Sequence, residues 1–186
     1  MTLLITGANG FIGRHVCAQL SHHHKILAVL RQPDTQLPAL RQQVNALGGQ
    51  GDRLQAVPGD LDLPALGLPA DLPAPRAIIH LGARFAWQLD RDSAHRTNVA
   101  GRLAVAELAR RHGSRLVFIS GFMLENREHL QRLGITSDDP EQVDWQAVYR
   151  RAGGYEASKL EAAIRVRALA AASDLALVDA LEEAQI

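Results

Sequence analysis

A tyrosine and a lysine in the sequence Tyr-Glu-Ala-Ser-Lys could carry out proton transfer. Tyr155 and Lys159 are four positions apart, so they share one face of a helix. A free tyrosine has a pKa of about 10, and a nearby ammonium lowers that pKa by favouring the phenolate. Tyr155 would then protonate a carbonyl oxygen as hydride arrives, or deprotonate an alcohol. Of the 20 basic residues only Lys25 and Lys159 are lysines, and a compact ammonium suits this role better than a guanidinium. The alternative is an ordinary surface pair.

A glycine-rich turn near the start of the chain could hold a dinucleotide. Thr6-Gly-Ala-Asn-Gly-Phe-Ile-Gly13 follows a short apolar run and opens a helical pattern. Gly7 allows a tight turn, Gly10 lets backbone approach a pyrophosphate, and Gly13 lets the helix pack close to the sheet. The free N–H groups at the helix start would bind the phosphates. This context favours a dinucleotide site over an ordinary strand-to-helix turn.

Apolar runs that alternate with helical patterns must position these residues. The predicted strands are Thr2–Thr6, Ile26–Leu30, Leu54–Val57, Ala77–Leu81, Arg115–Ser120 and Leu175–Val178. The predicted helices are Phe11–Leu20, Thr35–Leu47, Ser93–Arg111 and Tyr155–Ala172. Strands that are apolar throughout are buried on both faces. We therefore expect one α/β domain over residues 1–186, a doubly wound Rossmann fold with at least six parallel strands and helices on both faces.

One segment departs from this alternation. Residues 121–154 are rich in charge and lie between a predicted strand and the next long helix. Loops of that length within a compact domain are usually functional. We therefore predict an active-site lid or insertion, of which Glu125–Leu133 has helical propensity.

The glycine spacing, with Thr6 before it, resembles the extended branch of the short-chain dehydrogenase/reductase superfamily. Four further segments are similar to motifs of that family: Asp60 in Gly-Asp-Leu, His80-Leu-Gly-Ala83, Asn98 in Thr-Asn-Val-Ala-Gly, and Tyr155 with Lys159. Extended members have a C-terminal substrate lobe, which we expect to be largely absent from this sequence.

The resemblance implies roles for individual residues. It places cofactor contacts at Gly7, Asn9, Gly10, Phe11, Ile12, Gly13, Arg31, Asp60, Leu61, Leu81, Gly82, Ala83, Asn98, Tyr155 and Lys159. It makes Tyr155, Lys159 and Ser120 catalytic. The family usually has a second hydroxyl where this chain has Gly121, so either Ser120 serves as the carbonyl donor or one donor is missing, which can cost about 10²–10³ in rate.

The end of the second strand bears on which nicotinamide cofactor binds. NAD-preferring sites place an acidic residue there for the ribose 2′-hydroxyl, whereas this chain has Arg31-Gln32. Arg31, assisted by Arg14, could pair with the 2′-phosphate of NADP. We expect NADP, with NAD as the alternative if both arginines are merely solvated.

These features predict an NADP-dependent oxidoreductase that reduces a carbonyl of a small-molecule substrate, similar to dihydroflavonol or thioester reductases. One alternative is an NAD-dependent nucleotide-sugar epimerase or dehydratase. Another is a non-catalytic dinucleotide-sensing or interaction protein, in which Gly121 would mark a decayed site.

Composition bears on partners and location. The formal net charge is zero, which argues against a nucleic-acid partner. No membrane span or signal peptide is evident, so we expect a cytoplasmic protein. Cys17 is the only cysteine and His22–His24 is interpreted as a surface run, so no metal site is predicted.

Two further expectations concern packing. Trp87 and Trp145 could line a substrate cleft or pack in the core. Small residues on two helices could form a homodimer interface. They are Val99, Leu103, Ala106, Ala109–Arg110, Ala157, Ala162, Ala163 and Ala170–Ala172.

Overall fold

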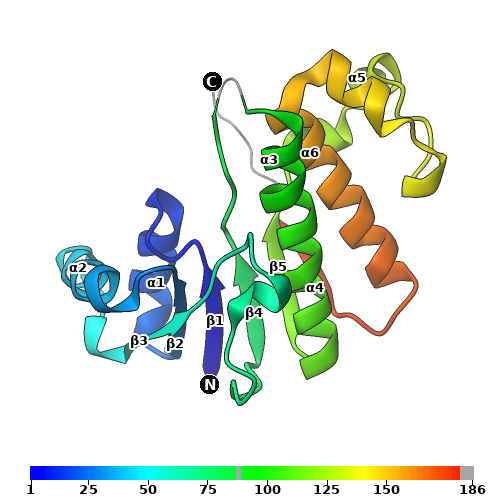
Figure 1. Cartoon of the computed structure of the whole chain (residues 1–186). Coiled ribbons are helices and arrows are strands. Elements are labelled where there is room, and N and C mark those ends of the chain that lie inside the picture. Colours follow the sequence, from blue (N-terminus) through cyan, green and yellow to red (C-terminus); the bar gives the residue numbers. More distant parts are fainter. Residues whose placement is uncertain (87–88, 181–186) are drawn as a thin grey trace.

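A parallel sheet forms the centre of the protein. The computed structural model describes residues 1–86 and 89–180 (Figure 1). The strands of the described residues are β1 (Thr2–Thr6), β2 (Lys25–Leu30), β3 (Leu54–Pro58), β4 (Ala77–His80), β5 (Arg115–Ile119) and β6 (Leu177–Ala180). Their order is β3-β2-β1-β4-β5-β6, with every neighbouring pair parallel. This is the doubly wound Rossmann order, and it confirms the predicted fold class.

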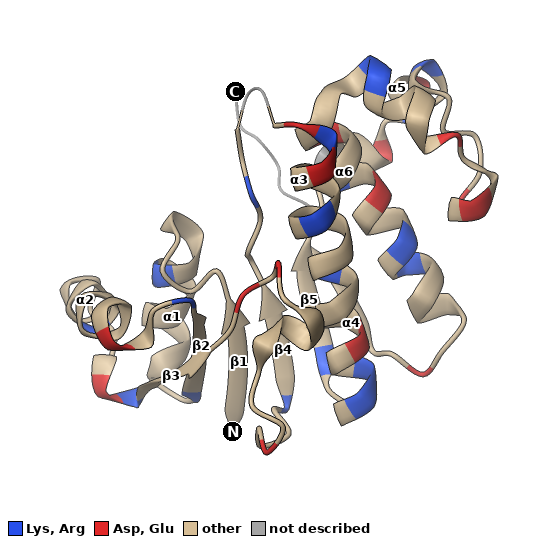
Figure 2. Cartoon of the chain, viewed as in Figure 1, with Lys and Arg blue, Asp and Glu red and all other residues tan. Residues whose placement is uncertain are grey.

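Helices cover both faces of the sheet (Figure 1). One face carries α1 (Phe11–Ser21) and α2 (Pro33–Ala46), and the other carries α4 (Gly101–His112) and α6 (Trp145–Ala171). Successive strand residues enter opposite cores, as Leu4 and Ile5 do in β1, because side chains alternate along a strand. Charged residues of both signs occur on the helices, whereas the strands carry few (Figure 2).

The predicted helix Ser93–Arg111 is one helical stretch with an irregular centre. It runs from α3 (Arg91–Ala94) through a π-helical turn (His95–Ala100) into α4. Turns of this kind are frequent at functional sites, and this one contains Asn98.

The segment 121–154 is more regular than predicted. It contains the 3₁₀ turns Phe122–Glu125 and Pro140–Gln142, the helix α5 (Arg127–Leu133), and the first turns of α6. Asn126 and Asp144 cap the two helices by accepting hydrogen bonds from the backbone N–H groups of His129 and Ala147, each at 3.0 Å. Such side-chain caps start helices. Further 3₁₀ turns lie at Gly51–Arg53 and Pro64–Gly67.

Two predicted boundaries were wrong. The helix expected to start at Tyr155 starts at Trp145, and it is interrupted at Gly153, whose φ of 76° and ψ of 173° are not helical. Gly153 is therefore a kink inside α6. The last predicted strand, Leu175–Val178, lies two residues later, at Leu177–Ala180.

Candidate cofactor and active site

The glycine turn packs against the end of β4 and leaves no room for side chains. Gly7 has a φ of 70°, and a Cβ there would lie 2.7 Å from the backbone nitrogen of Gly82. A Cβ at Gly13 would overlap the carbonyl oxygen of Gly7. The N–H of Gly10 donates to that same oxygen at 3.0 Å. Helix α1 then starts at Phe11 without a side-chain cap, which is the arrangement that suits a phosphate.

A cleft of about 390 Å³ lies at the carboxyl ends of β1 to β4. Seven of the predicted cofactor residues line it: Gly7, Asn9, Arg31, Asp60, Leu61, Gly82 and Ala83. Thr6, Val29, Leu30, Gln36, Gly59, Asp62, Arg84 and Thr97 also line it and were not predicted. Their positions at strand ends were the available signal, because ligands of this fold bind there.

The other predicted cofactor residues lie around this cleft. Gly10, Gly13 and Leu81 belong to the turns that shape it, and Phe11 is exposed, with 71% of its surface accessible. Arg14 lies over the ring of Phe11, with its guanidinium carbon 5.3 Å from the ring centroid. Arg14 therefore does not line the cleft beside Arg31, contrary to the predicted assistance.

Acidic residues organise the chain that follows β3. The carboxylate of Asp60 accepts a hydrogen bond from the N–H of Asp62 at 3.0 Å, a local turn typical of aspartate. Asp62 in turn accepts from the hydroxyl of Thr97. These contacts fix the connection after β3 against the π-helical turn, along the edge of the cleft.

Asn98 joins the segment after β4 to α6. Its amide oxygen accepts from the N–H of Arg84 at 2.7 Å, and its amide nitrogen donates to the Arg84 carbonyl and to the Ser158 hydroxyl, each at 3.0 Å. Ser158 donates to the carbonyl of Tyr155 at 2.8 Å. Asn98 is buried, so it holds the two walls of the site together.

Two of the three predicted catalytic residues, Ser120 and Lys159, lie at the end of β5. Tyr155 is half-buried and its ring meets that of Phe85 edge-on, at a centroid distance of 4.7 Å. Lys159 is 8% exposed, and its Nζ donates to the carbonyl of Ile119 at 3.1 Å. Ser120, the next residue, is 1% exposed, and its Oγ has no hydrogen-bond partner in the part of the chain that the structure describes. Ser120 and Lys159 are thus brought to one strand end.

A buried histidine lies beside these groups. Nδ1 of His80 is 2.7 Å from the hydroxyl oxygen of Thr6. Burial holds the pKa of His80 well below its usual value, and the charges of Arg102 and Lys159 act in the same direction. His80 is therefore a neutral ring at physiological pH.

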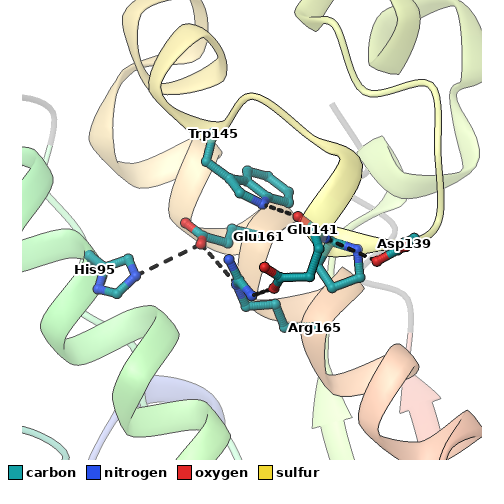
Figure 3. A network of polar contacts seen from close by, with 7 residues as sticks. His95, Asp139, Glu141, Trp145, Glu161 and Arg165 are labelled. Atoms are coloured by element: carbon teal, nitrogen blue, oxygen red, sulfur yellow. Dashed lines mark hydrogen bonds and ion pairs between the residues drawn. The ribbon is translucent and has the colours of Figure 1, made fainter.

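A polar network anchors α6 from its other side (Figure 3). Glu161 is buried, and its carboxylate accepts from Nε of Arg165 at 2.9 Å and lies 3.8 Å from Nε2 of His95. Arg165 also donates to Glu141 at 2.8 Å. The network joins α6 to the π-helical turn and to the 3₁₀ turn before α6, so it orients the helix that carries Tyr155.

The two tryptophans do not give evidence of a substrate cleft. Trp145 is buried, and its Nε1 donates to the carbonyl of Pro140 at 2.9 Å (Figure 3). Core packing is therefore its role. Trp87 lies outside the described residues. A second hollow, of about 450 Å³, lies between α5 and α6. Although it is larger than the cleft, no predicted site residue lines it, and we base no function on it.

Part of the predicted dimer stripe lies inside the chain. Ala106, Ala109, Ala157, Ala162 and Ala163 are all fully buried in the monomer. Their small side chains let the helices pack against the sheet and against each other, so these five are not available as an interface, whereas Arg110, Ala171 and Ala172 of the same stripe are exposed.

The described residues offer neither a metal cluster nor a membrane-spanning helix. Within the described residues, no cluster of three or more His, Cys, Asp or Glu side chains could hold a metal ion. None of the helices in that part of the chain has the length and apolar character needed to cross a membrane. Cys17, on α1, is buried in the core that this helix forms with the sheet.

Comparison with known proteins agrees with this geometry. The sequence matches the NAD-binding family Male sterility protein over residues 5–178. It is 33% identical over 172 residues to the PKS-NRPS hybrid synthetase cheA of Chaetomium globosum, covering 84% of this chain and 3% of the relative. It is 31% identical over 195 residues to the 2-alkyl-3-oxoalkanoate reductase of Stenotrophomonas maltophilia, covering 98% and 55%.

Solved structures share the fold. The thiolation-reductase di-domain of an archaeal non-ribosomal peptide synthetase superimposes with a TM-score of 0.70 at 22% identity, over 96% of this chain and 50% of that one. UDP-galactose 4-epimerase gives a TM-score of 0.66 at 19% identity, over 96% of this chain and 54% of that one.

The fold, the glycine turn and the Tyr155/Lys159 pair define an extended short-chain dehydrogenase/reductase, a class of NAD(P)-dependent oxidoreductases. Within that class, the chain belongs to the Male sterility protein family of NAD-binding domains. The chain spans from a few per cent to about half of the length of the relatives it matches.

Proposed function

We propose that this chain is the cofactor-binding and catalytic part of an NADP-dependent reductase that acts on a thioester or a ketone of a small molecule. One observation carries the proposal. Lys159, on the same helix as Tyr155, donates a hydrogen bond to the last residue of β5, directly before Ser120. The reductase name of one relative and the synthetase names of others support this substrate class.

The glycine turn fits a dinucleotide because a Cβ at Gly7 or Gly13 would fill the space that the backbone needs. When bound, the reduced nicotinamide supplies the hydride. The hydroxyl of Tyr155 donates its proton to the carbonyl oxygen, and Lys159 stabilises the phenolate that remains. Ser120 would donate a hydrogen bond to the same oxygen, since its buried Oγ has no partner among the described side chains and backbone.

Activity can be tested with an acyl-pantetheine thioester and with a 3-oxoacyl compound. We expect NADPH oxidation coupled to formation of an aldehyde from the thioester, or of an alcohol from the ketone. Tyr155→Phe should lower kcat by about 10²–10⁴-fold, the usual contribution of a general acid, and leave NADPH affinity unchanged. Near wild-type turnover in Tyr155→Phe would refute the role given to Tyr155.

The preference for NADP rests on the end of β2. Arg31 is exposed and lines the cleft together with Gln36, and the two residues directly after β2, Arg31 and Gln32, are not acidic. Arg31→Ala should weaken NADPH binding about tenfold, by loss of a charge-assisted contact, and leave NADH binding unchanged. Arg14→Ala is the matched control, because Arg14 lies over Phe11. Tighter binding of NADH than of NADPH would contradict the assignment.

The epimerase alternative keeps one supporting observation, the shared fold with UDP-galactose 4-epimerase. Such enzymes retain tightly bound NAD. Mass spectrometry of the nucleotide released from purified protein would separate the two functions, and we expect NADP or none. The non-catalytic alternative is opposed by the position of Lys159 at the end of β5.

We also propose a cytoplasmic homodimer. The location is supported by a lone buried cysteine, which is typical of reducing compartments. Any dimer must use surfaces other than the buried alanine stripe. Sedimentation equilibrium at micromolar concentration would decide between about 20 kDa and twice that mass, given a chain of 20.2 kDa.

A further inference from the structure

An arginine lies buried beneath the proposed catalytic pair. Arg102 is 2% exposed and stands on α4, four residues after Asn98. Its guanidinium carbon is 5.3 Å from the centroid of the Phe118 ring, and Phe118 is two residues before Ser120 on β5. The chain therefore keeps a cation inside the core at the strand end where Ser120 and Lys159 meet.

The sheet register shows which groups surround this cation. His80, Phe118 and Asp179 are paired across β4, β5 and β6, so their side chains project from the same face. That face packs against α4 and α6. Arg102 thus lies over the middle of a row that has a histidine on one side and a carboxylate on the other.

The charge of Arg102 is incompletely compensated. Among residues 1–86 and 89–180, its Nε and Nη1 have no hydrogen-bond partner, and the same is true of Oδ1 of Asp179 and Nε2 of His80. The other oxygen of Asp179 accepts from Nε of Arg167 at 2.8 Å. Asp179 is therefore already paired with a different arginine, and the field of Arg102 remains available to other groups.

Arg102 remains protonated in spite of its burial. Burial lowers its pKa to about 10, while negative charge on Asp179 and on a Tyr155 phenolate raises it. Electrostatic attraction is mutual. The guanidinium of Arg102 therefore stabilises a Tyr155 phenolate by as much as the phenolate stabilises the guanidinium. Because His80 is neutral, the buried cations beside this row of strand residues are Arg102 and Lys159.

We propose that Arg102 is a positioning residue for the reaction, whose buried charge stabilises the Tyr155 phenolate alongside Lys159. The groups that face this space are Lys159 on α6, Arg102 on α4, His80 on β4 and Asp179 on β6. The proposal rests on the proposed function for the role of Tyr155 as proton donor, but the phenolate itself can be observed without turnover.

The chain contains two tyrosines, Tyr149 and Tyr155, which allows a direct titration. In a Tyr149→Phe background, phenolate absorbance against pH reports Tyr155 alone. Arg102→Met removes the charge but keeps a long stem, and it should move the titration midpoint upward by about one pH unit, a tenfold loss of phenolate at fixed pH. Arg102→Lys keeps the positive charge, so its titration midpoint should lie close to that of the Tyr149→Phe background.

A second variant, Asp179→Asn, tests the proposal independently in case Arg102→Met does not fold. Asp179→Asn removes the negative charge from the same row, so the midpoint should move downward. In the reductive direction, the alkaline limb of the kcat profile should follow the same shifts, because protonated Tyr155 is the active form. Unchanged midpoints in folded Arg102→Met and Asp179→Asn would overturn the proposal. Shifted midpoints in a chain that reduces no carbonyl would refute the proposed function and leave the electrostatic coupling intact.

Discussion

The residue after Ser120 decides how many hydroxyl donors the site has. Gly121 is extended, with a φ of −173°, a conformation that any residue adopts. A Cβ at Gly121 would make only an ordinary contact, 3.6 Å from Cε of Met123. Neither backbone strain nor crowding therefore explains the glycine. Because Ser120 Oγ has no hydrogen-bond partner among the described residues, we propose it as the donor to a substrate oxygen.

Gly121→Ser tests whether one donor is enough. We expect Ser120→Ala to lower kcat by about 10²-fold or more and Gly121→Ser to change it less than threefold, with Gly121→Ala as the control for bulk. Steady-state rates on the same carbonyl substrate would measure all three. A large gain in Gly121→Ser, with Ser120→Ala silent, would show that the missing hydroxyl is the one that matters.

Asn98 offers a second test at the scale of single side chains. Its three hydrogen bonds hold Arg84 and Ser158 together, and removal leaves buried groups unpaired. Asn98→Ala should lower the free energy of unfolding by about 2–4 kcal/mol and weaken cofactor binding. Urea titration and NADPH titration would measure the two effects. Thr97→Ala is a neighbouring control that removes one hydrogen bond, and an equal loss in both variants would argue against the joining role.

At the scale of elements, the strands were predictable and the helix boundaries were less so. Strands buried on both faces are apolar throughout, so all six were found within about two residues of their bounds. Tyr155, Lys159 and the glycine turn were found because their spacing is local. The contact of His80 with Thr6 joins residues 74 positions apart, and the burial of Arg102 depends on helix orientation. Neither follows from local pattern.

The kink in α6 is the element feature that sequence reasoning misinterpreted. Gly153 has no neighbour within 4 Å of a Cβ, but its φ and ψ of 76° and 173° belong to a region used almost only by glycine. A Cβ at Gly154 would overlap the carbonyl oxygen of Leu89. The kink therefore sets how the first turns of α6 approach Tyr155.

Gly153→Ala should destabilise the protein by about 1–3 kcal/mol through backbone strain and lower kcat by misplacing Tyr155. Gly113→Ala is a matched control, since Gly113 also has positive φ, 60°, and open space around it, but ends α4 far along the chain from Tyr155. Thermal unfolding and turnover should show that both variants lose stability and only Gly153→Ala loses activity. Equal activity losses would contradict a local effect of the kink.

At the scale of the whole molecule, charge is balanced while the core holds several ionisable groups. The formal net charge is zero, and charges of both signs lie on the helices (Figure 2). Buried within are Lys159, Arg102, His80, Glu161 and Cys17. Groups whose pKa differs between folded and unfolded states make stability depend on pH. Burial shifts the pKa of Arg102, His80 and Cys17, so these three buried groups make the stability of the chain depend on pH.

Cys17 gives the clearest alkaline prediction. Burial raises the pKa of its thiol from 9.0 to about 12, so between these values the unfolded chain has lost a proton that the folded chain keeps. Stability due to this group is then complete below pH 9 and declines as pH rises toward 12, by up to about 1.4 kcal/mol for each pH unit.

Cys17→Ala should be less stable at neutral pH, because a buried sulfur is lost, but its decline above pH 9 should be shallower by that slope. Urea unfolding from pH 7.5 to 10.5 would measure both lines, and Ser21→Ala, another buried position on α1 without a thiol, should keep the wild-type slope. Parallel lines for wild type and Cys17→Ala would show that the thiol does not set the alkaline limit.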